Sequence, residues 1–342
     1  MPIKVLGYFY RRGLRPCFLR AGTLCLLVAV LFAGSFIFTG SSMAATPSYL
    51  PYPSNDSSII NPYGVTDETA MLLYALQPYY QQATGKTLHT KTVSGRGGAT
   101  GWGQLSSQPG DGYHLAATNL QNLILRSMAR RPVYQLNDVF NFCILAEAPL
   151  VLWVPEGSPF KTIGELAASA RAYPEQLIIA GTGSMSTSHI STLQFNFLSG
   201  SKTLYLPYLG TATAMQAATA GQAHAAWGYP LSDFGRQMRM RPLAVTAPAR
   251  LKHMIDVPTF DEAGIGLFVN NHFGLALPGT ASTNTRQEVS AVFNAIVANP
   301  EFRAGVEALG FSLPPEGASD VNMLLANEVV KLSALLDDYP ME

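Results

Sequence analysis

The sequence has few charged residues and no excess of either sign. Lysine plus arginine number 22 among 342 residues, aspartate plus glutamate also number 22, and charged residues make up only 13%. Binding to nucleic acid needs a basic excess or a basic run that neutralises phosphates. Neither is present, so we expect no nucleic-acid partner. A hydrophobic share of 48% excludes a disordered chain, and the length favours two domains.

Cysteine is scarce as well. Of the 3 cysteines, Cys17 and Cys25 lie within the first 45 residues, so Cys143 is the only one beyond them. A single cysteine cannot form an intramolecular disulfide. Its neighbours Phe142 and Ile144 are apolar, which predicts a buried structural thiol rather than a nucleophile.

Motifs of the common enzyme classes are missing. The histidines show no H-x-H or H-E-x-x-H spacing, and there is no G-x-S-x-G elbow and no Walker A loop. Gly95 and Gly97 begin a dinucleotide fingerprint, but Thr100 takes the place of its third glycine. We therefore expect no metal, no cofactor and no catalytic residue. An exported hydrolase that uses Ser184 or Ser188 stays as an alternative, without a visible base.

Residues 1–45 have the pattern of an export signal. Basic residues without any acid come first, an apolar stretch spans 21–38, and small residues at 42 and 44 offer a cleavage site. The basic residues are Lys4, Arg11, Arg12, Arg15 and Arg20. Removing this segment leaves 17 basic and 22 acidic residues. We predict a cleaved signal peptide and a periplasmic protein; the alternative is an uncleaved membrane anchor. The arginine pair only faintly resembles a twin-arginine signal.

The remaining chain alternates between strand and helix patterns after a Pro/Ser-rich tether over 46–58. A short strand is expected to end at 59–60, and further strands are expected at 88–93, 113–118, 177–180, 203–207, 223–227 and 243–246. A long apolar run spans 145–154. Beyond residue 246 the pattern is mainly helical, with helices at 284–298, 300–309 and 318–336. Such alternation predicts an α/β fold with mainly parallel sheets.

Ligands of parallel sheets bind at the carboxyl ends of strands, where the next helix begins with unpaired N–H groups. The richest such loop spans 180–189. Its glycines, Gly183 among them, let a backbone approach a ligand closely. Four hydroxyls follow, more than one helix cap needs, on Ser184, Ser186, Thr187 and Ser188. His189 either orients this loop or has a structural role. We predict that this loop binds a ligand.

Two further loops open helices in the same way. In the loop 61–67, Tyr63 is expected to lie over a ligand, and Gly64, Val65 and Thr66 are expected to offer N–H groups to an anion. Thr66 or Asp67 is expected to cap the next helix rather than act as an acid. The loop 206–213 is the other. The predicted ligand-binding set is completed by Asp67, Thr118, Asn119, Tyr208, Gly210, Thr211 and Tyr229.

The order of these loops resembles the periplasmic substrate-binding proteins of tripartite tricarboxylate transporters, the TctC-like Bug receptors. The matching segments are Gly-Val-Thr-Asp at 64–67, the glycine-rich 95–101, Pro-Gly-Asp-Gly-Tyr at 109–113, Pro-Leu-Val-Leu-Trp-Val at 149–154, 181–189, Leu-Pro-Tyr-Leu-Gly at 206–210, Arg-Pro-Leu-Ala-Val-Thr at 241–246, Arg250, Asp-Val-Pro-Thr-Phe-Asp-Glu-Ala-Gly at 256–264 and Gly-Leu-Ala-Leu-Pro-Gly at 274–279. They span about residues 58–336. The first loop departs from the family, because Tyr63-Gly64 stands where two adjacent glycines are usual.

The resemblance implies a two-lobed type II periplasmic binding protein with a ligand cleft between the lobes. Domain one would comprise 46–150 and 247–342, and domain two would comprise 151–246. The loops at 63–66 and 183–188 would hold a small carboxylate or amino-acid ligand. The protein, a monomer, would deliver the ligand to the permease subunits of a tripartite tricarboxylate transporter. A sensory module that signals to a membrane partner is the alternative.

Overall fold

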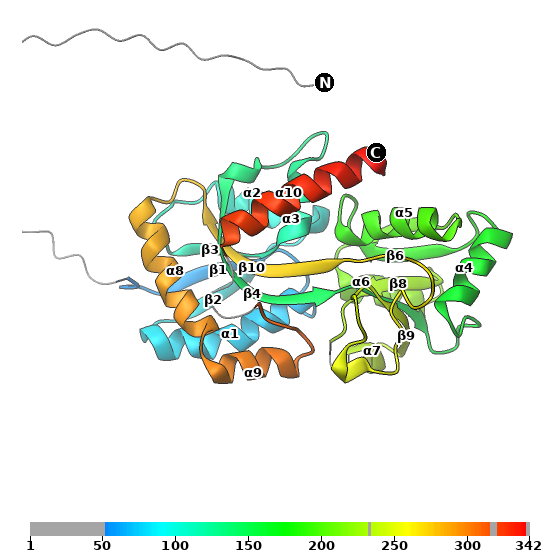
Figure 1. The fold of residues 1–342 in the computed structure, drawn as a ribbon. Coiled ribbons are helices and arrows are strands. Elements are labelled where there is room, and N and C mark those ends of the chain that lie inside the picture. Colours follow the sequence, from blue (N-terminus) through cyan, green and yellow to red (C-terminus); the bar gives the residue numbers. More distant parts are fainter. Residues whose placement is uncertain (1–51, 232–233, 315–319, 340–342) are drawn as a thin grey trace, which may run out of the picture. The chain divides into compact units, whose positions relative to one another are not determined.

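The computed structural model describes residues 52–231, 234–314 and 320–339; the predicted signal segment lies outside them. Its strands form two five-stranded sheets (Figure 1), ordered β2-β1-β3-β10-β4 and β7-β6-β8-β5-β9. The strands of the first sheet are β1 (Ser57–Asn61), β2 (Leu88–Thr92), β3 (His114–Asn119), β4 (Val139–Pro149) and β10 (Asn270–Pro278). Those of the second are β5 (Val151–Pro155), β6 (Ile178–Thr182), β7 (Leu204–Tyr208), β8 (Ala225–Gly228) and β9 (Met240–Val245).

Helices flank both sheets. Those that accompany the first sheet are α1 (Glu68–Thr84), α2 (Ala99–Ser106), α3 (Leu120–Ser127), α8 (Thr283–Val297), α9 (Pro300–Ala308) and α10 (Val321–Asp338). Those of the second are α4 (Ile163–Ala172), α5 (Thr187–Ser199), α6 (Thr211–Thr219) and α7 (Phe234–Gln237). Short 3-10 turns are η1 (Arg96–Gly98), η2 (Leu136–Asp138) and η3 (Lys252–Met254). We call each sheet with its helices a lobe.

The α/β class is confirmed, and the sheets are mixed. In the first sheet β1 pairs in parallel with β2 and β3, whereas β10 pairs antiparallel with β3 and β4. In the second, β6 pairs in parallel with β7 and β8, whereas β5 pairs antiparallel with β8 and β9. Parallel neighbours need a crossover helix that returns the chain over its own sheet. Strand β5 instead follows β4 after one residue, Leu150, and runs straight into the other sheet.

Strand β10 was not predicted, because the chain beyond residue 246 was expected to be mainly helical. All residues of β10 except Asn270 are buried, since the strand lies between β3 and β4. A strand buried on both faces shows no alternation of apolar and polar residues, so the periodicity gave no signal. The other expected strands and the three C-terminal helices are present, within a few residues of their expected bounds. The apolar run 145–154 is divided at Leu150 between β4 and β5, which belong to different sheets.

The two connections between the sheets are held together by Thr246. The first connection is Leu150, between β4 and β5, and the second runs from β9 to β10. The buried Thr246 hydroxyl accepts a hydrogen bond from the Leu150 N–H at 2.9 Å and donates to the Val269 carbonyl at 2.7 Å. One side chain therefore fixes both connections to each other.

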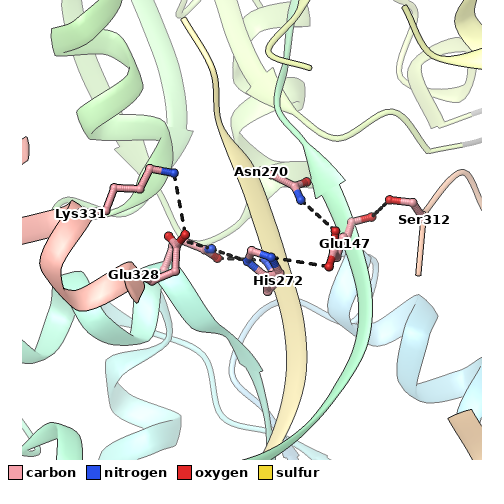
Figure 2. Close-up of polar contacts among 7 residues, drawn as sticks. Glu147, Asn270, His272, Ser312, Glu328 and Lys331 are labelled. Atoms are coloured by element: carbon pink, nitrogen blue, oxygen red, sulfur yellow. Dashed lines mark hydrogen bonds and ion pairs between the residues drawn. The ribbon is translucent and has the colours of Figure 1, made fainter. Parts of the chain in front are cut away.

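A polar cluster anchors α10 to the strands that lead into these connections (Figure 2). Glu147 of β4 accepts from Asn270 Nδ2 at 3.0 Å and lies 3.6 Å from His272 Nε2, both on β10. On the other side of His272, Gln121 Nε2 lies 2.6 Å from Nδ1 and donates to Glu328 of α10 at 3.2 Å. Burial lowers the pKa of His272. The cluster thus holds β4, β10 and α10 together in the first lobe, where the two connections leave it.

The strands of each sheet fall within the residue ranges expected for the two domains. The described residues nevertheless pack as one compact unit, so the division into two domains stays a prediction. Within the described ranges, no helix has the length and apolar character that a membrane span requires.

Candidate functional site

Asp67 joins the two lobes at the start of two helices. It occupies the N-cap position of α1, as expected, but its side chain makes no cap bond within that helix. Its carboxylate instead accepts the N–H of Gly64 at 2.7 Å and the N–H of Ala212, in the first turn of α6, at 2.8 Å. The expectation of a local cap was therefore wrong. The N–H of Ala212 at the start of α6 lies within reach, and an N–H group bonds to a carboxylate more strongly than to a neutral acceptor.

Asn122 makes the second link. Its Oδ1 accepts the N–H of Thr187 at 2.8 Å and lies 3.2 Å from the Thr187 hydroxyl, so it binds the first residue of α5 from across the lobes. Its Nδ2 donates to the hydroxyl of Tyr63 at 3.0 Å. Tyr63 is buried and packs edge-on against Trp102. The loops at 61–67 and 180–189, predicted separately, thus meet through one asparagine.

Asn119 makes the third link. It is the N-cap of α3, and its Nδ2 donates to the hydroxyl of Tyr229 at 3.0 Å and to Asn271 Oδ1 at 3.2 Å. Tyr229 lies just after β8 of the second lobe, whereas Asn119 and Asn271 end β3 and begin β10 of the first. All three residues are buried. The hydroxyl of Tyr229 is therefore held by the strand ends of the other lobe.

Gly183 approaches the other lobe at the backbone. It has a φ of +64°, and a Cβ built on it would lie 2.8 Å from the Cα of Gly97. Arg126 reinforces this contact, since its Nη1 donates to the carbonyl of Ser184 at 2.9 Å. Gly183 was expected to approach a ligand, which stays a prediction; in the structure it lies against the backbone of the glycine-rich loop.

Two adjacent carboxyl groups are buried where the lobes meet. Asp67 and Glu68 are each 2% exposed. Burial raises the pKa of Asp67, and the N–H bonds from Ala212 and Gly64 offset this rise only in part. Burial and the neighbouring Asp67 raise the pKa of Glu68 to about 8. The Glu68 charge in turn contributes to the raised pKa values of Tyr63 and Tyr229, for which burial is the larger cause. The two N–H bonds favour the ionised form of Asp67, whereas Glu68, with its pKa raised to about 8, holds a proton at neutral pH.

Several predicted residues do not join this group. Val65 and Thr66 are exposed. Thr118 is buried inside the first lobe, where its hydroxyl donates to Asn141 at 3.0 Å. Tyr208 points away, and its hydroxyl donates to Gln222 at 3.0 Å. Each of these side chains is oriented by its own lobe, which the position of a residue in a loop does not reveal.

The serine hydroxyls of the loop 180–189 serve the second lobe itself. Ser186 caps α5 by accepting the N–H of His189 at 3.2 Å, and Ser188 accepts the N–H of Thr182 at 3.0 Å. His189 stacks on Tyr205 with ring centroids 4.5 Å apart, and burial lowers its pKa. Its Nδ1 faces the Met185 N–H at 3.4 Å. The hydroxyls of Ser186 and Ser188 therefore shape the loop, whereas Thr187 bonds to Asn122 of the first lobe.

The start of α6 completes the group of predicted residues that the structure brings together. Gly210 is the N-cap of α6, and a Cβ on it would meet the carboxylate of Asp67. The hydroxyl of Thr211 is buried 3.3 Å from that of Thr182. With these two, the group comprises Tyr63, Gly64, Asp67, Asn119, Gly183, Thr187, Gly210, Thr211 and Tyr229.

Sequence reasoning missed Glu68, Asn122, Asn271 and Ala212. Glu68 and Asn122 lie in helices rather than in loops at strand ends, and Asn271 is the second residue of β10, the strand that was not predicted. Two asparagines one helical turn apart, at 119 and 122, were the only available signal. In the described ranges, no group of three or more potential ligands could hold a metal ion.

Comparison with known proteins gives one family. A family model described as a tripartite tricarboxylate transporter family receptor matches residues 75–340. A relative described as a UPF0065 protein in the gbd 5′ region of Cupriavidus necator is 26% identical over 267 residues, which is 77% of this chain and 81% of the relative. The prediction of a binding protein rather than an enzyme is confirmed by the family match.

Solved structures show the same fold. The periplasmic binding protein BugD matches with a TM-score of 0.78 at 21% identity, over 85% of this chain and 99% of BugD. MatC from Rhodopseudomonas palustris, solved with bound malate, matches with a TM-score of 0.76 at 21% identity, over 83% of this chain and all of MatC (100%). The two-lobed fold expected from the order of the loops is confirmed.

Proposed function

This chain belongs to the tripartite tricarboxylate transporter receptor family, and on that premise we propose that it captures a small carboxylate-bearing solute between its lobes. One observation carries the proposal: the N–H of Ala212 at the start of α6 already binds a carboxylate, that of Asp67, from across the lobes. The N–H of Thr187 at the start of α5 likewise binds a side chain of the other lobe, Asn122. Carboxylates bind well at such helix starts, without a lysine or arginine.

Capture uses the two connections as a hinge. Domain one comprises 46–150 and 247–342, domain two comprises 151–246, and they rotate about Leu150 and Thr246. A solute that contacts both lobes shifts the hinge toward the arrangement in which the lobes meet. The bound solute replaces some of the direct hydrogen bonds between the lobes, such as the one from the Thr187 N–H to Asn122. MatC supports this reading, since a relative of the same fold was solved with a dicarboxylate.

Delivery follows export. The N-terminal signal directs the chain to the periplasm and is cleaved, and the mature protein is a monomer. The permease subunits of a tripartite tricarboxylate transporter recognise the lobes when they are brought together around the solute. The solute leaves when the hinge opens against the permease.

Binding is tested by thermal unfolding and calorimetry with a panel of carboxylates, beginning with malate and succinate. A ligand of the native state raises the melting temperature, and at a concentration of 100 times its Kd it stabilises by about 2.7 kcal/mol. The variant Asn122→Ala removes one lobe-to-lobe acceptor and should change the affinity of any solute bound there. The proposal fails if no carboxylate binds, or if the affinity of a bound one is the same in this variant.

A further inference from the structure

Glu68 has a carboxyl oxygen with no partner, although the residue is almost fully buried. The residue is 2% exposed, and its Oε2 makes no hydrogen bond. Within the described part of the chain, neither Glu68 nor Asp67 forms an ion pair with a lysine, arginine or histidine. Hydrogen bonds with the Thr211 hydroxyl and with the backbone of Glu68 itself serve the carboxyl group only in part. A buried polar atom without a partner costs free energy, so the retention of Oε2 at the contact between the lobes calls for a reason.

A second polar atom without a partner lies in the same region. Asn271 is fully buried, and its Nδ2 makes no hydrogen bond. The Oδ1 of Asn271 accepts a hydrogen bond from Asn119, which also donates to the hydroxyl of Tyr229. The charge of Glu68 contributes to the raised pKa of the same tyrosine. The surroundings of Tyr229 thus hold an unused acceptor, Glu68 Oε2, and an unused donor, Asn271 Nδ2.

The charges argue against a dianion at this position. Asp67 accepts two N–H bonds, which favour its ionised form, and further negative charges beside that carboxylate would be repelled at low dielectric. A cation would be attracted. The groups that face Glu68 are Asp67 on its own element, Tyr63 in the preceding loop, and Thr211 and Tyr229 from the second lobe.

We propose that the solute carries an ammonium group, which pairs with the carboxylate of Glu68, beside a carboxylate that is held by N–H donors. The inference rests on the proposed function and narrows its solute class from carboxylates in general to amino acids. In the free protein Glu68 holds a proton at neutral pH. Pairing with the ammonium group therefore releases that proton to solvent, and the ammonium group keeps its own.

The test uses pairs of compounds that differ only by the ammonium group. Protein purified from the periplasm of cells that express the full chain is titrated with L-aspartate and succinate, L-alanine and propionate, L-leucine and 4-methylpentanoate, and L-phenylalanine and 3-phenylpropionate. We expect at least one amino acid to bind at least tenfold more tightly than its partner. Glu68→Gln should abolish that preference. The matched control is Glu301→Gln, which makes the same change in the first turn of α9 at an exposed site.

Proton release is measured on the unmodified protein, so the test does not depend on a variant that folds. Calorimetry in two buffers of different ionisation enthalpy should show about one proton released per amino acid bound near pH 7. Affinity should rise with pH between 6 and 8 by up to tenfold per unit.

Each other outcome overturns the inference. Equal or tighter binding of the compounds without an ammonium group refutes it and leaves the proposed function standing. A preference that survives Glu68→Gln, or binding without proton release, excludes Glu68 as the partner. If no member of any pair binds, the inference and the proposed function both fail.

Discussion

The carboxylate of Asp67 accepts a hydrogen bond from the N–H of Ala212 at 2.8 Å, although the two residues are 145 positions apart. This bond brings the start of α6 against the start of α1. Two glycines make room for it, because a Cβ at Gly64 or at Gly210 would meet the carboxylate of Asp67. The position of Asp67 between two glycine backbones therefore decides how the lobes meet.

Replacing Gly210 with alanine should weaken the contact between the lobes. The φ of Gly210 is −164°, which alanine adopts without strain, so the effect comes only from the displaced Asp67. Loss of a bond to a buried carboxylate should lower the free energy of unfolding by about 1–3 kcal/mol, as measured by urea denaturation. Gly266→Ala is the control, since its Cβ would meet nothing within 4 Å. Equal stability of the two variants would show that Asp67 can move at no cost.

Replacing Gly183 with alanine tests the backbone contact with Gly97. Gly200 has almost the same φ, +63° against +64°, but its Cβ would meet only the Arg171 side chain at 4.0 Å. Both substitutions therefore carry the same backbone strain, about 1 kcal/mol. Gly183→Ala should cost at least about 1 kcal/mol more, because a Cβ must push the lobes apart. Urea denaturation of the two variants gives this difference directly, and a difference near zero would contradict the contact.

Loops at strand ends could be predicted from the sequence, but the bonds between them could not. Tyr63 and Thr187 lie in loops that strand and helix periodicity predicts, and Tyr229 was part of the predicted ligand-binding set. Their partners Asn122 and Asn119 lie on another element, α3 and its cap, and such pairing depends on how the lobes are packed. The hydroxyls of Ser186 and Ser188 illustrate the reverse case. They were expected to face a ligand, yet the first turn of α5 and the end of β6 already use them.

Replacing Thr246 with valine should destabilise the connections between the sheets. Valine keeps the shape of threonine and removes the hydroxyl, so the side-chain bonds to Leu150 and Val269 are lost. The site is buried, so water cannot easily replace these bonds, and we expect a loss of about 1–3 kcal/mol in the free energy of unfolding. Thr283→Val, at the exposed start of α8, is the control. A Thr246→Val protein as stable as this control would show that the hydroxyl does not hold the connections.

Stability should depend on pH through Glu68. Its pKa rises from its usual 4.5 to about 8 in the folded protein, so between these values the folded state binds more protons than the unfolded state. The free energy of unfolding therefore falls as pH rises through this window, by at most about 1.4 kcal/mol per pH unit. Below pH 4.5 the residue is protonated in both states, and above pH 8 the loss is complete.

The variant Glu68→Gln isolates this effect. Glutamine cannot titrate. As the pH rises from 5 to 8, the unfolding free energy of the unmodified protein should therefore fall steadily relative to that of Glu68→Gln. Glu301→Gln, the same substitution at an exposed site, is the matched control. A constant difference for Glu68→Gln would mean that Glu68 is ionised throughout. In that case the Glu68 carboxylate must already have a compensating partner in the free protein. The argument for an ammonium group in the solute would then fail.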